Sequence, residues 1–201
     1  MEFSKIIMEF SKIQVTKQGT LKATYKDVDG NVIDFCGANV VHKDLKEAMR
    51  QLVPHVAIIT EQREAYGQRL EDLRGISITD DGDNIYKRLT IDSVSFLAGG
   101  STIAIGGTRI LTKTGVISLG TPNIDLTDSD AYEFNGELDI DIEAVKYEAE
   151  QYITERKWGV KQAEIDFKDI EPFDGVEAGD VPEADTKPAP KKRGRKPKKV
   201  A

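Results

Sequence analysis

The residues best suited to molecular recognition form a basic run at the end of this 201-residue chain. Eight Lys or Arg and no acid lie between Lys187 and Lys199. Gly194 has no side chain, so the backbone can lie on the floor of a narrow minor groove while Arg193 and Arg195 enter its negative potential. The surrounding lysines suit salt-dependent contacts with phosphates. The nucleic-acid-binding residues predicted in this way are Lys191, Lys192, Arg193, Gly194, Arg195, Lys196, Lys198 and Lys199.

This run resembles an AT-hook, whose core is Arg-Gly-Arg-Pro in a basic, proline-bearing context. The resemblance implies contact with the minor groove of DNA. The chain departs from the motif because Lys196 stands between Arg195 and Pro197. This insertion weakens the case for a preference for A·T sequences but not the case for affinity for DNA. The alternative is a polycationic tail that binds any nucleic acid.

An acidic segment precedes the basic run. Residues 163–186 carry nine Asp or Glu and one Lys, and residues 1–162 carry 26 acidic and 19 basic side chains, a charge of −7. Polyanion binding is therefore expected only at the tail. We hypothesise that the acidic segment pairs with the tail and competes with DNA for it.

Other reactive residues are few, with two histidines and one cysteine in the whole chain. We expect His42 and His55 to pack at helix ends. A nucleophilic pair of Cys36 and His42 lacks a third, orienting group, so no catalytic residue is predicted. Cys36 is expected to pack as a small core residue. A single cysteine also excludes an internal disulfide and a cysteine-rich zinc site, and favours a reducing compartment.

Three segments have some features of ligand-binding loops but are interpreted as turns. Asp27–Asn31 and Asp80–Asn84 look faintly like calcium loops, but position twelve counted from Asp27 is Ala38, and the flanks are predicted strands. Gly99–Gly107 lacks the Gly-Lys-Ser/Thr ending of a phosphate loop and is expected to form hairpin connections. We therefore predict no metal site and no cofactor.

The elements that carry these residues follow from hydrophobic periodicity. Alternation at period two predicts three strands between residues 8 and 35, with Gly30 in a hairpin turn. Leu45, Leu52 and Ile59 lie on one stripe of a predicted helix, which Pro54 should kink near Arg50. A meander of about four strands follows Gly75, with Gly pairs as turns or bulges. A last amphipathic helix starts near Asn135, a candidate cap, and ends near Gly159.

Strands grouped in this way predict an α+β fold: a mainly antiparallel sheet of about six or seven strands with two amphipathic helices packed on it. Met1–Ile6 and Met8–Ile13 have the same sequence, so residues 1–7 are interpreted as a duplicated start. The predicted organisation is an α+β domain at 8–162, a disordered acidic linker at 163–186 and a disordered basic tail at 187–201. No apolar run reaches the roughly 18 residues of a membrane span, and no signal peptide is visible.

The body resembles a group of proteins encoded by bacteriophages and prophages, often near recombination and single-strand-binding genes. The resemblance rests on Asp44–His55, Gly107–Leu111, Leu119–Pro122, Glu150–Gly159 and Ile165–Phe167. It implies a phage setting in a bacterial host and transfers no functional residues.

These observations predict a non-enzymatic phage or mobile-element accessory protein of DNA metabolism. DNA is the partner expected for the tail, and a protein is a further candidate partner for the folded domain. No membrane partner is expected, and the predicted location is the cytoplasm. The alternative function is a phage structural or assembly protein whose tail contacts packaged nucleic acid.

Overall fold

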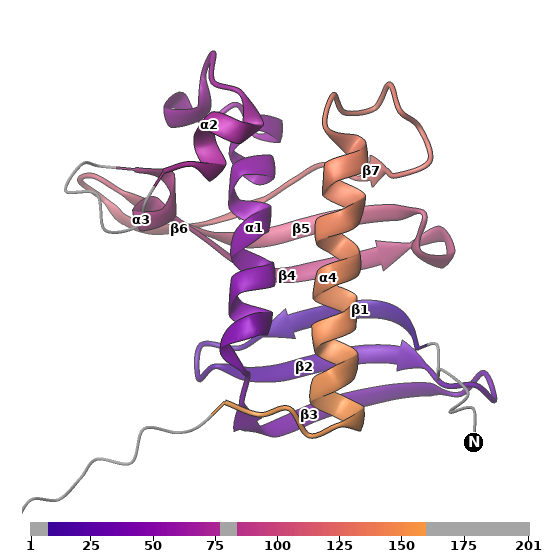
Figure 1. Ribbon diagram of the computed structural model, residues 1–201. Helices are drawn as coiled ribbons and strands as arrows, with labels where there is room; N and C mark the ends of the chain where they lie inside the picture. Colours follow the sequence, from indigo (N-terminus) through magenta and orange to yellow (C-terminus); the bar gives the residue numbers. More distant parts are fainter. Residues whose placement is uncertain (1–7, 77–83, 160–201) are drawn as a thin grey trace, which may run out of the picture. The chain divides into compact units, whose positions relative to one another are not determined.

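The computed structural model describes residues 8–76 and 84–159 (Figure 1). The predictions made for residues 1–7, for the acidic linker and for the basic tail lie outside the described residues. The α+β prediction is confirmed, because the described chain forms a seven-stranded antiparallel sheet with helices.

The sheet has the strand order β3-β2-β1-β4-β5-β6, and the short β7 pairs with β5. The strands are β1 (Glu9–Val15), β2 (Thr20–Lys26), β3 (Val32–Val40), β4 (Leu89–Leu97), β5 (Thr102–Leu111), β6 (Gly115–Gly120) and β7 (Ile124–Asp125). Asp27–Asn31 forms the predicted turn between β2 and β3, and Gly30 has the positive φ of 81° that this turn requires.

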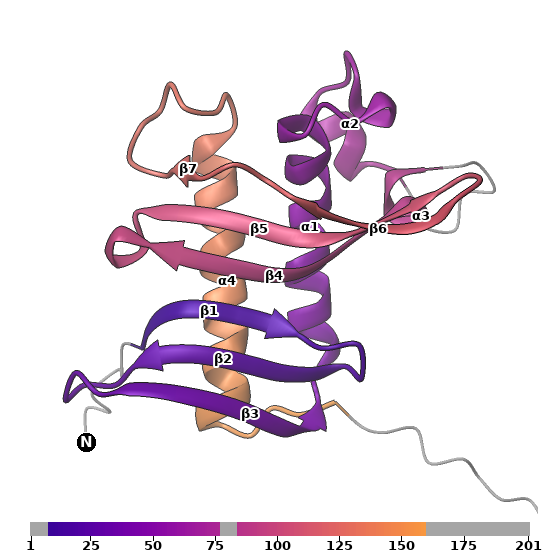
Figure 2. The ribbon, with the colours of Figure 1, turned by 180° about the vertical axis from the view of Figure 1, so that it is seen from behind.

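Two long helices lie side by side and antiparallel on one face of the sheet (Figures 1 and 2). They are α1 (Lys43–Ile59) and α4 (Asn135–Thr154). Shorter helical segments are η1 (Arg63–Ala65), α2 (Leu70–Arg74), α3 (Ile85–Arg88) and η2 (Ala98–Gly100). Figure 2 shows that neither long helix covers the other face of the sheet.

The fold repeats one order of elements. β1, β2 and β3 form a meander followed by α1, and β4, β5 and β6 form a second meander followed by α4. The two meanders meet where β1 pairs with β4 through Lys12↔Ser95, Ile13↔Val94 and Gln14↔Ser93. The antiparallel junction and antiparallel helices relate the two halves by an approximate two-fold arrangement, which the chain's hydrophobic pattern did not reveal.

The core lies between the sheet and the two helices. Along the strands, alternate residues such as Ile13, Leu21 and Val94 are fully buried against the helices. The predicted stripe of α4 is confirmed, since Leu138, Ile142, Val145, Ala149 and Tyr152 are all buried.

The prediction that Cys36 is a core residue is wrong. Cys36 is exposed, because β3 alternates and Cys36 points to the face that no long helix covers. Its neighbour Phe35 points to the helix side, where its ring meets that of Tyr152 edge-on with centroids 6.1 Å apart.

The prediction of hairpin connections holds for Gly99-Gly100 and fails for Gly106-Gly107, where the predicted alternative, a bulge, agrees with the strand pairing. Gly99 and Gly100 have positive φ and form the predicted turn before β5. Gly106 and Gly107 instead lie inside β5, opposite an irregularity of β4 between Ile91 and Ser93. A Cβ on Gly107 would overlap the carbonyl oxygen of Thr90 and lie 3.1 Å from Ile91 Cα. Gly107 is therefore required because the β4 backbone approaches it closely, and not because the chain turns there.

The predicted helix from Leu45 to Ile59 is confirmed as α1, which continues through Pro54 and ends at Ile59, whereas the end of the last helix differs from the prediction. α4 ends at Thr154, before Arg156 with a positive φ of 56°, and so stops short of Gly159. Asn135 caps nothing: its side-chain amide donates to the carbonyls of Asp125 at 3.0 Å and Asp128 at 2.8 Å, which ties the preceding loop to the helix.

Candidate functional site

The predicted nucleic-acid-binding residues, Lys191–Arg195, Lys196, Lys198 and Lys199, lie outside the described residues. Within the described ranges, the structure places His42, His55 and Cys36 in separate surroundings. A cationic cleft beside α1, which sequence reasoning missed, is the remaining candidate.

His55 belongs to a polar cluster between α1, α2 and α4. Its side chain is completely buried. Its Nδ1 lies 3.0 Å from the hydroxyl of Tyr132, and its Nε2 lies 3.1 Å from Oδ2 of Asp141. Arg74 donates to the same carboxylate oxygen at 2.6 Å.

Two tautomers of His55 fit the contacts of this cluster. Because a carboxylate can only accept, the tautomer that donates from Nε2–H to Asp141 leaves Nδ1 to accept from Tyr132. Nη2 of Arg74 also lies 3.1 Å from Nε2, so in the other tautomer Nε2 accepts from Arg74 and Nδ1–H donates to the Tyr132 hydroxyl. Burial raises the pKa of the Tyr132 phenol far above its usual value, which keeps the hydroxyl protonated. Both ring nitrogens face protein partners, so the cluster joins three helices and the loop before α4. This placement differs from the predicted packing at a helix end.

His42 lies at the helix end where it was predicted to pack, as the N-cap residue just before α1. Its Nδ1 accepts from the backbone N–H of Asp44 at 3.3 Å and so caps the helix. Lys157 reaches the Asp44 and Glu148 carboxylates at 2.7 Å each and so links the ends of α1 and α4. The hydrogen bond from Lys157 lowers the pKa of Asp44. Across the described ranges, no hydrogen bond or ion pair joins His42 to Cys36.

The first calcium-like loop is confirmed as a turn. Oδ1 of Asp27 accepts from the backbone N–H groups of Asp29 at 3.0 Å and Asn31 at 2.8 Å. Hydrogen bonds, chiefly from Asn31, lower the pKa of this carboxyl. In the second segment, residues 80–83 lie outside the described residues, and Asn84 caps α3 by accepting from the backbone of Lys87 at 3.1 Å.

A second charged cluster lies at one end of the β5–β6 hairpin. Arg109 Nη2 donates to both carboxylate oxygens of Glu64, at 2.8 and 2.9 Å. Burial opposes ionisation of Glu64, but the Arg109 hydrogen bond and the nearby guanidinium charges prevail and lower its pKa. This pair fastens η1 to β5.

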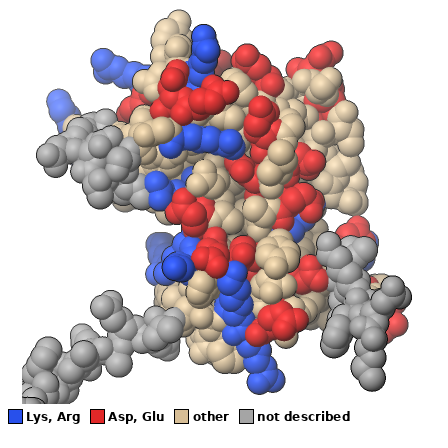
Figure 3. Space-filling view, viewed as in Figure 1, with Lys and Arg blue, Asp and Glu red and all other residues tan. Residues whose placement is uncertain are grey.

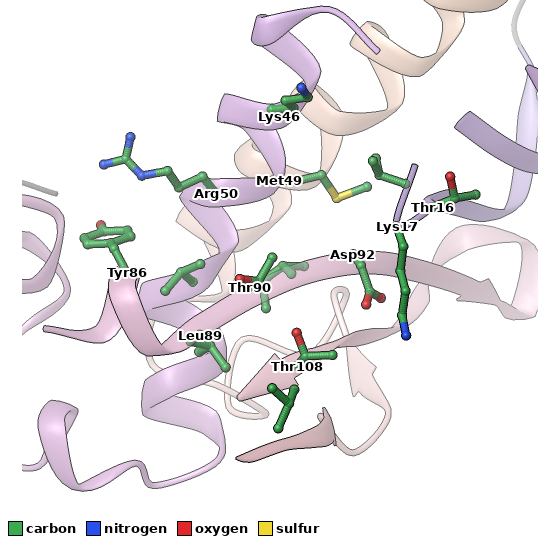
Figure 4. A pocket seen from close by; sticks show the side chains of 14 residues that line it. Thr16, Lys17, Lys46, Met49, Arg50, Tyr86, Leu89, Thr90, Asp92 and Thr108 are labelled. Carbon is green, nitrogen blue, oxygen red and sulfur yellow. The ribbon is translucent and has the colours of Figure 1, made fainter. Parts of the chain in front are cut away.

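The cleft lies where the two halves of the sheet separate. β1 pairs with β4 only as far as Gln14↔Ser93, so the following residues of β1 diverge from the first residues of β4. The cavity in this gap has a volume of about 660 Å³. Its lining comes from the β1–β2 turn, α1, α3 and the start of β4, with contributions from β5 and β6 (Figure 4).

The lining combines an apolar wall with basic side chains. Met49, Val53, Leu89 and Ile91 are buried and form the apolar part. The charged residues of the lining are Lys17, Lys46, Arg50 and Asp92, three cations and one carboxylate. The site is therefore cationic on a body whose net charge is negative.

Comparisons with protein-family models, curated proteins and solved structures found no match. No helix among the described residues is long and apolar enough to cross a membrane. In the same residues, no group of three or more His, Cys, Asp or Glu side chains is arranged to hold a metal ion.

Proposed function

We propose that the protein is a non-enzymatic phage or mobile-element accessory protein of DNA metabolism, held on DNA by residues 187–201 in the cytoplasm of its bacterial host. The observation that carries the proposal is the sequence Lys191–Lys199, in which Arg193-Gly194-Arg195 lies among five lysines. Cations at this density bind DNA by displacing condensed counterions.

The charge of the body supports assignment of the main DNA contact to the tail. α4 carries six Asp or Glu and one Lys. Acidic side chains accordingly gather over α4 on the helix face of the molecule (Figure 3). A phosphate backbone approaching this face meets net repulsion, so a long-range attraction to DNA has to come from elsewhere.

A titration of the full-length protein against labelled duplexes tests the proposal. Contact between all eight tail cations and phosphates would give a slope of log affinity against log salt of about −7. Arg193→Ala/Arg195→Ala should weaken binding and remove any preference for A·T-rich over G·C-rich duplex. The matched control Lys191→Ala/Lys192→Ala removes the same charge and should weaken both duplexes equally. Unchanged affinity after loss of residues 187–201 would refute the proposal.

The same titration also tests whether the acidic segment regulates DNA binding by the tail. If it competes with DNA for the tail, deletion of residues 164–185 should tighten binding and steepen its salt dependence. Unchanged affinity would show that the two segments act independently.

One observation favours the alternative, a phage structural or assembly protein. β6 lies at an edge of the sheet, and the β5–β6 hairpin exposes Ile110, Val116 and Ile117 by 49%, 63% and 43%. An apolar edge strand is a template for pairing with another chain. Assembly predicts a mass that rises with concentration in light scattering and falls for Val116→Lys/Ile117→Lys; a monomer at every concentration would exclude it.

A further inference from the structure

The cleft between the two halves of the sheet has the size and accessibility of a ligand site. Ligand pockets typically measure about 300–1,000 Å³, and this cavity of about 660 Å³ lies within that range. It is open, since Thr90 and Val116 are exposed in its lining. Figure 3 shows the molecule hollowed at the flank of α1 that faces away from α4.

Two of the cations in the cleft are lysines at the surface of the molecule. Lys17 and Lys46 are exposed, and neither makes a hydrogen bond or ion pair within the described residues. They come from different elements, Lys17 from the β1–β2 turn and Lys46 from the first turn of α1 (Figure 4). Two separate ammonium groups suit two oxygens or phosphates of an extended anion.

A cationic and aromatic pair completes the wall. The guanidinium of Arg50 lies 4.7 Å from the ring centroid of Tyr86, and its Nη1 donates to Glu47 at 3.0 Å. Arg50 Nε is buried and has no hydrogen-bond acceptor among the described residues.

Together these features suit a ligand with an apolar, planar part and neighbouring negative charges. We propose that the cleft binds an unpaired nucleotide of single-stranded DNA, with its base against the apolar wall beside Tyr86 and its flanking phosphates on Lys17 and Lys46. A base in a duplex cannot enter a recess without leaving its stack, so the site selects unpaired strands. The choice of DNA over an acidic peptide rests on the proposed function.

The test uses the full-length chain with the eight tail cations replaced by Gln, so that binding by the body is measured without the tail. In this background, Lys17→Gln/Lys46→Gln should weaken binding of a labelled oligo-dT strand about tenfold at physiological salt and reduce the salt slope by about 1.4, the value for two contacts with a single strand. The matched control Lys43→Gln/Lys113→Gln removes two exposed lysines outside the cleft and should change affinity less than twofold. Circular dichroism melts of all variants establish that the fold is retained.

Photo-cross-linking with 5-iododeoxyuridine strands supplies a positional readout that charge alone does not. Cross-links should map to the peptide that contains Tyr86 and should disappear with an excess of unlabelled strand. Equal affinity for duplex, equal competition by a mononucleotide, tighter binding of an acidic peptide, or equal effects of the two lysine pairs would each overturn the inference. If the tail-substituted protein binds no DNA while the unmodified protein does, this inference fails and the proposed function stands. If the unmodified protein binds no DNA, the proposed function fails.

Discussion

Replacement of His55 by Phe should destabilise the protein by about 3–5 kcal/mol. The ring is fully buried, so the substitution retains an aromatic volume while removing both hydrogen bonds. The buried hydroxyl of Tyr132 is left without its hydrogen-bond partner, at a cost of about 1–3 kcal/mol. Asp141 loses a hydrogen bond to a charged group, worth about 1.5–3 kcal/mol, and retains Arg74.

The two losses can be separated by a double-mutant cycle. Tyr132→Phe alone should cost about 1–2 kcal/mol, because it leaves Nδ1 of His55 unpaired. In His55→Phe/Tyr132→Phe no orphaned hydroxyl remains, so the double variant should be more stable than the sum of the single effects implies, by about 1–2 kcal/mol.

Urea unfolding measures these differences directly. With a slope of about 2 kcal/mol/M, His55→Phe should lower the midpoint by about 1.5–2.5 M. The other histidine is the control: His42→Ala removes a half-exposed cap and should cost about 0.5–1 kcal/mol. A loss below 1 kcal/mol for His55→Phe, or strict additivity in the cycle, would refute the view that these contacts hold the helices together.

Three further changes have expected outcomes. Gly107→Ala should lower the free energy of unfolding by about 1–3 kcal/mol in urea unfolding, because the added Cβ would overlap the β4 backbone. The control is Gly136→Ala, where nothing lies within 4 Å of the added Cβ, and it should be neutral or stabilising. Equal effects of the two substitutions would contradict this prediction. The folded-state pKa of Glu64 is below its ordinary 4.5, so the ionised carboxylate stabilises the fold above that pH, and the contribution disappears as pH falls through the folded pKa. Glu64→Gln should therefore make the free energy of unfolding less dependent on pH below about pH 4.5. An unchanged pH dependence in this range would contradict a stabilising role for the ionised Glu64. Cys36, exposed on the uncovered face, should react with a thiol reagent in the folded protein without an unfolding lag; protection until unfolding would contradict its placement.

Much of the fold follows from local patterns in the chain. Alternation of Leu21, Ala23 and Tyr25 predicts β2, and the Asp-Gly turn after it fixes the next hairpin. Period two alone does not identify which face the helices cover. The prediction for Cys36 failed because it did not settle which face of β3 carries this residue. Cys36 follows Phe35, whose side chain points to the helices, so Cys36 points to the opposite face, away from the core.

The glycines show the limit of the same reasoning. Gly99-Gly100 and Gly106-Gly107 look alike in sequence, yet one pair turns the chain and the other lies within a strand. The difference arises from the irregularity in β4 opposite Gly107, a partner that only strand pairing defines. A glycine pair predicts a turn or a bulge, and the local sequence does not decide between the two.

Neither candidate site has a local signature. His55 meets Tyr132 and Asp141 across separations of 77 and 86 residues, so its partners cannot be read from spacing along one element. The cleft likewise unites Lys17 of a hairpin turn with Lys46 and Arg50 of a helix. The i and i+4 spacing of Lys46 and Arg50 on α1 was the single available signal, and it is equally typical of a solvated helix face.

The cleft marks a departure from the approximate two-fold arrangement of the fold. At one end of the β1–β4 junction, η2 lies against β1 and closes the sheet. At the other end, the corresponding β1–β2 turn stands away from the start of β4, and the cavity opens there beside Lys17 and Lys46, which make no ion pair with the described residues. A three-residue junction between two complete meanders suffices to hold the sheet together, because α1 and α4 pack across both halves. Stability therefore does not require the second end to close, and local departures from a consistent fold are where binding sites are expected. On this argument, a substitution that closes the gap should stabilise the body while it removes single-strand binding.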